Sequence, residues 1–136
     1  MIGILIVTHG NFGLELLKSA ELIVGKQENV DAIGFNHGDN VEELYSKVNK
    51  SIKKLDKGEG VLVFTDLFGG SPSNVTAINM KDLRFESISG VNLPMLIEAL
   101  DTRTRSSLEE LVDMVIQIGV DGIKNIRTEL KAKGAE

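Results

Sequence analysis

The sequence predicts an α/β fold in which a parallel sheet is covered by helices on both faces. Four short runs of apolar and β-branched residues alternate with segments of helical periodicity, and connections of a few residues join them. The first run is apolar throughout, which is typical of a strand buried on both faces of a parallel sheet. Because connections between parallel strands are right-handed, this alternation predicts a doubly wound sheet of strand order 2-1-3-4, within a single domain spanning residues 1–136.

The first half of the chain is expected to contain two strands and two helices. We place the first strand at residues 2–7, followed by a helix that Asn11 caps and that ends at Gly25. The second strand is expected at residues 30–35, and Asp39 or Asn40 would cap the next helix. The apolar positions expected to face the core are Phe12, Leu16, Ala20 and Ile23 in the first helix, and Val41, Leu44, Tyr45, Val48, Ile52 and Leu55 in the second.

The third strand is expected at residues 60–65, and the fourth at residues 85–89. Between them, Ser71 and Pro72 predict the start of a short helix, because serine is a good N-cap and proline is favoured at the first helical position. After the fourth strand, Asn92 would cap a further helix.

The C-terminal third is expected to end in a long helix that begins at Ser106 or Ser107, and residues 102–105 before it are interpreted as a polar loop. The tail is ambiguous. Gly119 and Gly122 disfavour a helix, whereas the apolar spacing through Leu130 would extend it.

The composition excludes several classes of function. The formal net charge of −5, from 15 basic and 20 acidic residues, argues against binding to nucleic acid or to an anionic membrane and suits a basic or mixed-charge protein partner. The absence of cysteine excludes disulfides and thiolate metal sites. No signal peptide precedes the first strand and no apolar run approaches the ~20 residues that span a bilayer, so we expect a cytoplasmic protein.

Two side chains are expected to meet where the sheet changes its winding direction. His9 follows the first strand and Asp66 follows the third, and these strands flank the crevice at the carboxyl edge of a 2-1-3-4 sheet. An aspartate that accepts a hydrogen bond from one ring nitrogen would leave the other nitrogen as a nucleophile. We therefore expect His9 and Asp66 to be catalytic.

A candidate anion site follows Asp66 directly. Gly69 and Gly70 allow close approach of the backbone to a ligand, and Ser71 opens a helix whose N-terminus favours negative charge. Phosphoryl transfer requires mainly positioning and charge stabilisation, which this segment could supply without a metal. The chain has neither a Walker A loop nor a dinucleotide-binding fingerprint, so we expect no cofactor and a phosphoryl donor other than ATP.

The second histidine, His37, follows the second strand, away from the crevice between the first and third strands. No acidic and glycine-rich loop opposes it, so we interpret it as a residue of a surface loop. A metal site built from the two histidines would need a third ligand, and the sequence does not demand one.

The chain resembles the IIA component of the mannose/fructose family of the sugar phosphotransferase system, over nearly its whole length. The resemblance is carried by an Asp-x-x-Gly-Gly-Ser-Pro segment at residues 66–72 at its characteristic distance from a His-Gly pair, and a Gly-Val-Asn-x-Pro-Met segment at residues 90–95 strengthens it. Residues 6–10 and 25–30 add to the match.

The resemblance implies a flavodoxin-like fold and a defined phosphoryl relay. His9 would accept a phosphoryl group from the phosphohistidine of the carrier protein HPr and pass it to a IIB component. A membrane permease of IIC and IID components would couple this transfer to sugar uptake. Asp66 matches the aspartate that bonds the active imidazole, and Gly70 and Ser71 match the loop around the phosphoryl group.

The resemblance also implies a homodimer in which a C-terminal antiparallel strand, at residues 122–128 here, is exchanged between subunits. Since the sequence stops at Glu136, we expect IIB to be a separate polypeptide. An alternative is the related phosphoryl-donor subunit of phosphoenolpyruvate-dependent dihydroxyacetone kinases, which uses a similarly placed histidine. A non-catalytic regulatory or flavin-binding module fits less well, because the first strand is followed by neither clustered acids nor a hydroxyl-rich loop.

Overall fold

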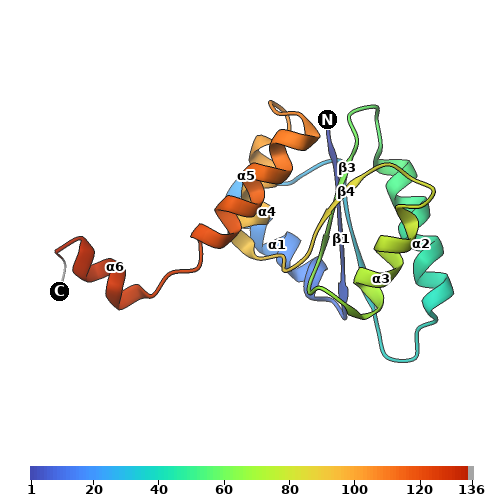
Figure 1. Ribbon diagram of the computed structural model, residues 1–136, viewed down its shortest axis with the longest axis horizontal. Coiled ribbons are helices and arrows are strands. Elements are labelled where there is room, and N and C mark those ends of the chain that lie inside the picture. The colour runs from blue at the N-terminus through green and yellow to red at the C-terminus, as the bar shows by residue number, and fades with distance from the viewer. Residues whose placement is uncertain (135–136) are drawn as a thin grey trace.

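The computed structural model describes residues 1–134 and contains one four-stranded parallel sheet in the order β2-β1-β3-β4, as predicted (Figure 1). The central strand β1 pairs with β2 on one side and β3 on the other, with Ile4 opposite both Val30 and Leu62. The strands are β1 (Gly3–His9), β2 (Val30–Phe35), β3 (Val61–Thr65) and β4 (Glu86–Ile88).

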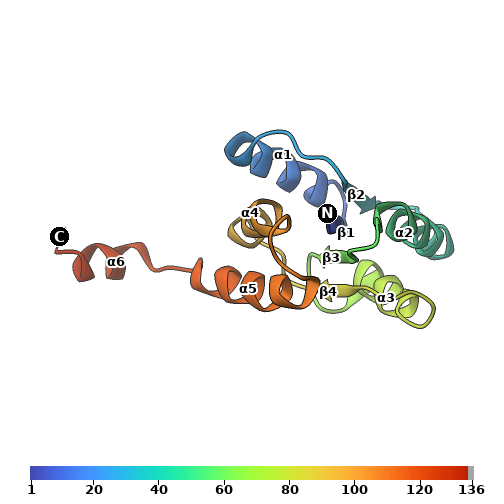
Figure 2. The same cartoon turned by 90° about the horizontal axis from the view of Figure 1, so that it is seen from above.

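Helices cover both faces of this sheet (Figures 1 and 2). The helices α1, α4 and α5 pack on one face, and α2 and α3 pack on the other. The bounds are α1 (Phe12–Val24), α2 (Val41–Leu55), α3 (Gly70–Asn79), α4 (Leu93–Thr102), α5 (Leu108–Asp121) and α6 (Ile126–Ala132).

The apolar first strand contributes side chains to two separate hydrophobic cores. Its side chains alternate between the faces, so Ile4 and Ile6 join the core under α1, α4 and α5, while Leu5 and Val7 join the core under α2 and α3. All four side chains are 0% exposed. The strand is therefore held rigidly up to its last residue, His9.

The predicted buried face of α1 was partly wrong. Phe12 and Ile23 are 48% and 63% exposed, and the buried residues of the helix are Gly13, Leu17 and Ala20. The expected cap was wrong too, because the Asn11 side chain accepts no capping bond. Instead Thr8 accepts the hydrogen bond of the Gly13 N–H at 2.9 Å, which fixes the rotation of the helix from the end of β1.

Three other predicted caps are confirmed. Asn40 accepts from the N–H groups of Glu42 and Glu43, and Asn92 accepts from the N–H of Met95. Ser107 forms a reciprocal capping box with Glu110. These bonds satisfy backbone donors that a helix leaves unpaired in its first turn.

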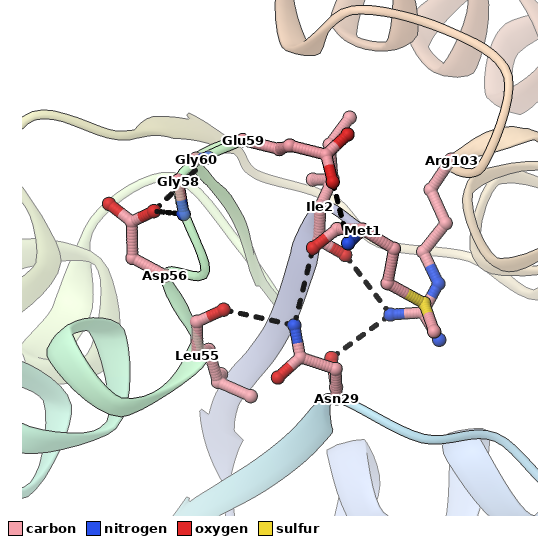
Figure 3. A network of polar contacts seen from close by, with 9 residues as sticks. All are labelled: Met1, Ile2, Asn29, Leu55, Asp56, Gly58, Glu59, Gly60 and Arg103. Atoms are coloured by element: carbon pink, nitrogen blue, oxygen red, sulfur yellow. Dashed lines mark hydrogen bonds and ion pairs between the residues drawn. The ribbon is translucent and has the colours of Figure 1, made fainter.

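Residues 102–105, expected to be a polar loop, contain the largest fully buried side chain of the described chain. Arg103 is 1% exposed, and its guanidinium donates to the carbonyls of Ile2 and Asn29 at 3.1 and 3.0 Å (Figure 3). It also donates to Gln27 and to the Glu28 carbonyl. The prediction failed because these acceptors are mostly backbone carbonyls distant in sequence, which no local pattern reveals.

The C-terminal tail forms neither the predicted strand nor an extension of the long helix. Helix α5 ends at Asp121, and the tail forms the separate helix α6, which buries no residue and projects away from the sheet (Figures 1 and 2). Its N-cap Asn125 accepts from the Thr128 N–H at 3.0 Å, which starts a helix within the expected strand at residues 122–128. In a single chain, the local cap at Asn125 therefore favours a helical conformation for this segment.

In the described residues, no helix is long and apolar enough to cross a membrane.

Candidate active site

His9 is the last residue of β1 and stands at the carboxyl edge of the sheet. Thr8 before it is fully buried, whereas the His9 side chain is 47% exposed. Gly10 then adopts a φ of +58° and donates its N–H to the Phe35 carbonyl at 2.8 Å. The chain therefore turns away immediately after the imidazole, which remains accessible.

Asp66 meets His9 as predicted, although the two residues are 57 positions apart. One carboxylate oxygen, Oδ2, accepts from the His9 backbone N–H at 2.9 Å and lies 2.8 Å from the ring Nδ1. Because an ionised carboxylate only accepts hydrogen bonds, this contact places the ring proton on Nδ1. No described residue bonds Nε2, so this nitrogen carries the free lone pair when the ring is neutral.

The hydrogen bonds to His9 also set the ionisation of Asp66. Partial burial raises the pKa of the Asp66 carboxyl, but the bonds from the His9 backbone and ring, together with the charge of His9, outweigh this and lower the pKa below its ordinary value. The other oxygen, Oδ1, accepts from the Leu67 N–H at 3.1 Å. Asp66 is thus held as a carboxylate that orients the imidazole.

The N-terminus of α3 lies against the other side of the imidazole. Gly69 and Gly70 have φ values of +105° and +78°, which favour glycine. A Cβ on Gly70 would lie 3.0 Å from the His9 Cε1 and 3.2 Å from Nε2. The backbone of Gly70 therefore borders the free nitrogen closely, and a Cβ there would push against the ring.

Ser71, predicted as the N-cap of α3, lies instead inside the first turn, because the helix begins at Gly70 with Gly69 as the cap. This start has no side-chain cap, and its first turn contains no acidic residue. Free N–H groups at a helix N-terminus favour an anion. Gly70 and Ser71 can offer their N–H groups to an anion beside Nε2, and Ser71 can add its hydroxyl.

Two residues that support the site were not identified from the sequence. Thr8 orients the start of α1 through the bond to Gly13. Gly34, on β2, has no room for a side chain, because a Cβ there would overlap the Gly10 carbonyl oxygen. The glycine inside the predicted strand was the available signal, since such a glycine often marks a close backbone approach.

His37 lies in an exposed turn after β2, as expected. Residues 1–134 contain no group of three His, Cys, Asp or Glu side chains that could hold a metal ion.

Together, the doubly wound sheet and this site define a class of α/β domain in which an imidazole at the carboxyl edge of the sheet lies beside a helix N-terminus that can bind an anion. Comparison with known proteins gives the family. The model of the family described as "PTS system fructose IIA component" matches residues 3–116. This chain belongs to that family of phosphotransferase-system IIA components.

The relatives agree with this assignment. The chain is 42% identical to the PTS system mannose-specific EIIAB component of Escherichia coli (strain K12), over 98% of this chain and 42% of that protein. It is 34% identical to the PTS system fructose-specific EIIA component of Bacillus subtilis (strain 168), over 83% of this chain and 78% of that protein. The chain thus spans about two fifths of the mannose-specific relatives.

Solved structures show the same likeness. The phosphotransferase system component EIIA from Streptococcus agalactiae superposes with a TM-score of 0.86 at 39% identity, covering 94% of this chain and 99% of that one. The mannose/sorbose-specific IIA subunit from Enterococcus faecalis superposes with a TM-score of 0.82 at 26% identity, covering 91% and 93%. The family and relatives do not favour the dihydroxyacetone kinase alternative.

Proposed function

We propose that this domain is a phosphotransferase that carries a phosphoryl group in phosphoenolpyruvate-dependent sugar uptake. It accepts the group from phospho-HPr on His9 and passes it to a IIB component. The observation that supports this most directly is the 2.8 Å contact between the His9 Nδ1 and Asp66, which leaves Nε2 open beside the start of α3. We further propose that residues 1–136 act as a single IIA domain.

In this proposal the His9 Nε2 is the nucleophile. Its lone pair forms a new N–P bond as the N–P bond of the donor phosphohistidine breaks, and the donor imidazole keeps that electron pair. The His9 ring gains positive character while its Nδ1 keeps its proton. The Asp66 carboxylate, 2.8 Å away, stabilises that charge. The same steps in reverse deliver the group to the acceptor.

Gly69, Gly70 and Ser71 form the proposed phosphoryl-binding loop. The uncapped start of α3 offers N–H groups and the positive end of the helix dipole to the phosphoryl oxygens. Proline at position 72 has no N–H, so the donors come from Gly70, Ser71 and the residues after Pro72. The step needs no metal in this arrangement.

The wider assembly follows from the family. We propose that the domain acts in the cytoplasm and supplies, through IIB, a membrane permease of IIC and IID components. We also propose a homodimer with exchange of the C-terminal segment. It is supported by the exposed edge of the three-residue strand β4 and by α6, which buries no residue within its own chain.

Intact-protein mass spectrometry under non-acidic conditions tests the central proposal. The protein is incubated with phosphoenolpyruvate, HPr and the enzyme that phosphorylates HPr. We expect the mass of one added phosphoryl group, its loss in acid, and its absence from His9→Ala. The matched control His37→Ala should be labelled like the wild type. Label that persists in His9→Ala, or an unlabelled wild-type protein, would contradict the proposal.

A further inference from the structure

One buried hydroxyl interrupts the apolar side chains of β1, directly before His9. Thr8 is 0% exposed, and the other buried residues of this strand are glycine, isoleucine, leucine and valine. A buried hydroxyl costs stability unless it is hydrogen-bonded, and valine has nearly the same shape without that cost. The Thr8 hydroxyl should therefore have a specific partner, and the position of that partner indicates what the hydroxyl does.

The partner is the first turn of α1, which has no side-chain cap of its own. The side chain of Asn11 accepts no capping bond, so the N–H of Gly13, the second residue of the helix, depends on the Thr8 hydroxyl, which accepts it at 2.9 Å. The methyl group of Thr8 packs against the same glycine, because a Cβ on Gly13 would lie 3.1 Å from the Thr8 Cγ2. Thr8 thus joins the end of β1 to α1 by a hydrogen bond and by contact.

The bond between Thr8 and Gly13 closes a short loop that begins with His9. The next residue, Gly10, has a φ of +58°, and its carbonyl oxygen accepts from the Thr8 hydroxyl at 3.5 Å. The Gly10 N–H donates to the Phe35 carbonyl at 2.8 Å. The backbone directly after the imidazole is therefore held by the neighbouring strand and by Thr8.

The backbone position of His9 in turn sets the position of its ring. Asp66 Oδ2 accepts from the backbone N–H of His9 at 2.9 Å and contacts the ring Nδ1 at 2.8 Å. Because one oxygen bonds both groups, a displacement of the His9 backbone would lengthen one of these contacts or turn the ring. Thr8 and His9 point to opposite faces of the sheet, since side chains alternate along a strand. Thr8 can therefore hold the end of the strand from one face while the imidazole stays accessible on the other.

We propose that Thr8 is a positioning residue for phosphoryl transfer at His9. Its hydroxyl holds the loop after His9 in the conformation that keeps the ring Nδ1 bonded to Asp66 and Nε2 beside the start of α3. Without the hydroxyl, the Gly13 N–H would be buried without an acceptor, and the first turn of α1 would move to reach water or another acceptor. That movement would displace the loop that begins with His9. This inference rests on the proposed function of His9.

The test compares Thr8→Val, which keeps the shape but removes the hydroxyl, with Thr8→Ser, which keeps the hydroxyl but removes the methyl group. Thr102→Val is the matched control, because Thr102 is 7% exposed and its hydroxyl donates to Glu98 at 3.2 Å within α4. Each protein receives its phosphoryl group either from phospho-HPr or from phosphoramidate, a small donor. Phosphoramidate, protonated on nitrogen, gives its phosphoryl group to Nε2 as its own N–P bond breaks and ammonia leaves.

For Thr8→Val we expect the transfer rate at saturating phospho-HPr to fall by ~10-fold or more, with KM changed by less than ~2-fold. Labelling by phosphoramidate should fall to a similar extent, because the defect lies at the ring. Thr8→Ser should recover most of the wild-type rate, and Thr102→Val should match the wild type. A wild-type rate in Thr8→Val overturns the proposal. So does an equal defect in Thr8→Ser, because the methyl group would then explain it.

Nitrogen NMR spectra of the His9 imidazole give a readout that a purely structural role would not move. At a pH where the ring is neutral, the wild type and Thr8→Ser should carry the proton on Nδ1, whereas Thr8→Val should show a mixture of the two tautomers. A wild-type tautomer in Thr8→Val overturns the proposal even if transfer is slow, because the hydroxyl would then not act through the bond to Asp66.

Two measures separate the possible failures. Thermal unfolding checks that each variant is folded at the assay temperature, and Thr8→Ala replaces Thr8→Val if the latter is not. If neither donor labels the wild-type His9, the proposed function fails, whereas the tautomer measurement still tests the action of Thr8 on the ring.

Discussion

Replacing Gly70 with alanine should block phosphoryl transfer while leaving the protein folded. The new Cβ would lie 3.0 Å from the His9 Cε1 and 3.2 Å from Nε2, against the ~3.5–4.0 Å of ordinary carbon contacts. The imidazole would have to move by several tenths of an ångström, and the methyl group would occupy space next to the attacking nitrogen. Since a misplacement of about 1 Å can cost ~100-fold in rate, we expect a loss of that order in kcat/KM for phospho-HPr.

Gly69→Ala is the matched control for this experiment. Gly69 also has a positive φ, +105°, but nothing lies within 4 Å of the position of its Cβ. Both variants should lose about 1–2 kcal/mol of stability through backbone strain. That loss corresponds to a decrease in Tm of roughly 3–10 °C for a domain of this size.

The assays are rapid-quench transfer from phospho-HPr and thermal unfolding followed by circular dichroism. We expect similar Tm values for the two variants and a large difference in transfer rate. Equal transfer rates in Gly69→Ala and Gly70→Ala would refute the argument, because strain alone would then explain any defect and contact with the ring would play no part.

Three further predictions concern residues around the site and the core. Asp66→Asn should slow transfer by ~100-fold or more, because it weakens the bond that fixes the Nδ1 proton; single-turnover kinetics measure the rate. Because folding lowers the pKa of Asp66, the carboxylate stabilises the fold fully above the ordinary carboxyl pKa of about 3.9, and this stabilisation is lost as the pH falls through the lowered pKa. The free energy of unfolding in urea should therefore fall less on acidification in Asp66→Asn than in the wild type. Arg103→Met should cost ~2–5 kcal/mol in urea unfolding, because it removes the buried guanidinium that donates to the carbonyls of Ile2 and Asn29, and a loss below 1 kcal/mol would contradict that role. Gly34→Ala should lower both Tm and the transfer rate, since its Cβ would displace the Gly10 carbonyl that follows His9; wild-type values for both would show that the turn adjusts freely.

The sheet could be predicted from the sequence because its strands are buried on both faces. Continuous apolar runs such as residues 2–7 leave few other interpretations, and the order of the elements determines the rest. Caps with a local signature, such as Asn40 and Ser107, could be predicted to within one residue, since Asp39 and Ser106 were equally good candidates. Arg103 was not, because a charged residue in a polar segment usually lies in solvent, and its partners are 74 to 101 residues away.

The candidate site was predictable at the level of topology. A 2-1-3-4 sheet brings the ends of its first and third strands together, so His9 and Asp66 could be paired without coordinates. The orientation of the ring could not be predicted, because it depends on which Asp66 oxygen accepts which bond. The closeness of Gly70 to Nε2 likewise depends on where α3 begins, two residues earlier than the sequence suggested.

The pair of hydrogen bonds that Asp66 Oδ2 accepts from His9 has a consequence for the order in which the partner proteins bind. A single oxygen accepts both the main-chain N–H and the ring N–H of His9, so the imidazole cannot swivel between a loading and an unloading position. Only one nitrogen is open, and it offers one line of in-line approach. In the proposed relay the two partner proteins must therefore take turns at the same face, and the reaction should follow a ping-pong scheme without any ternary complex.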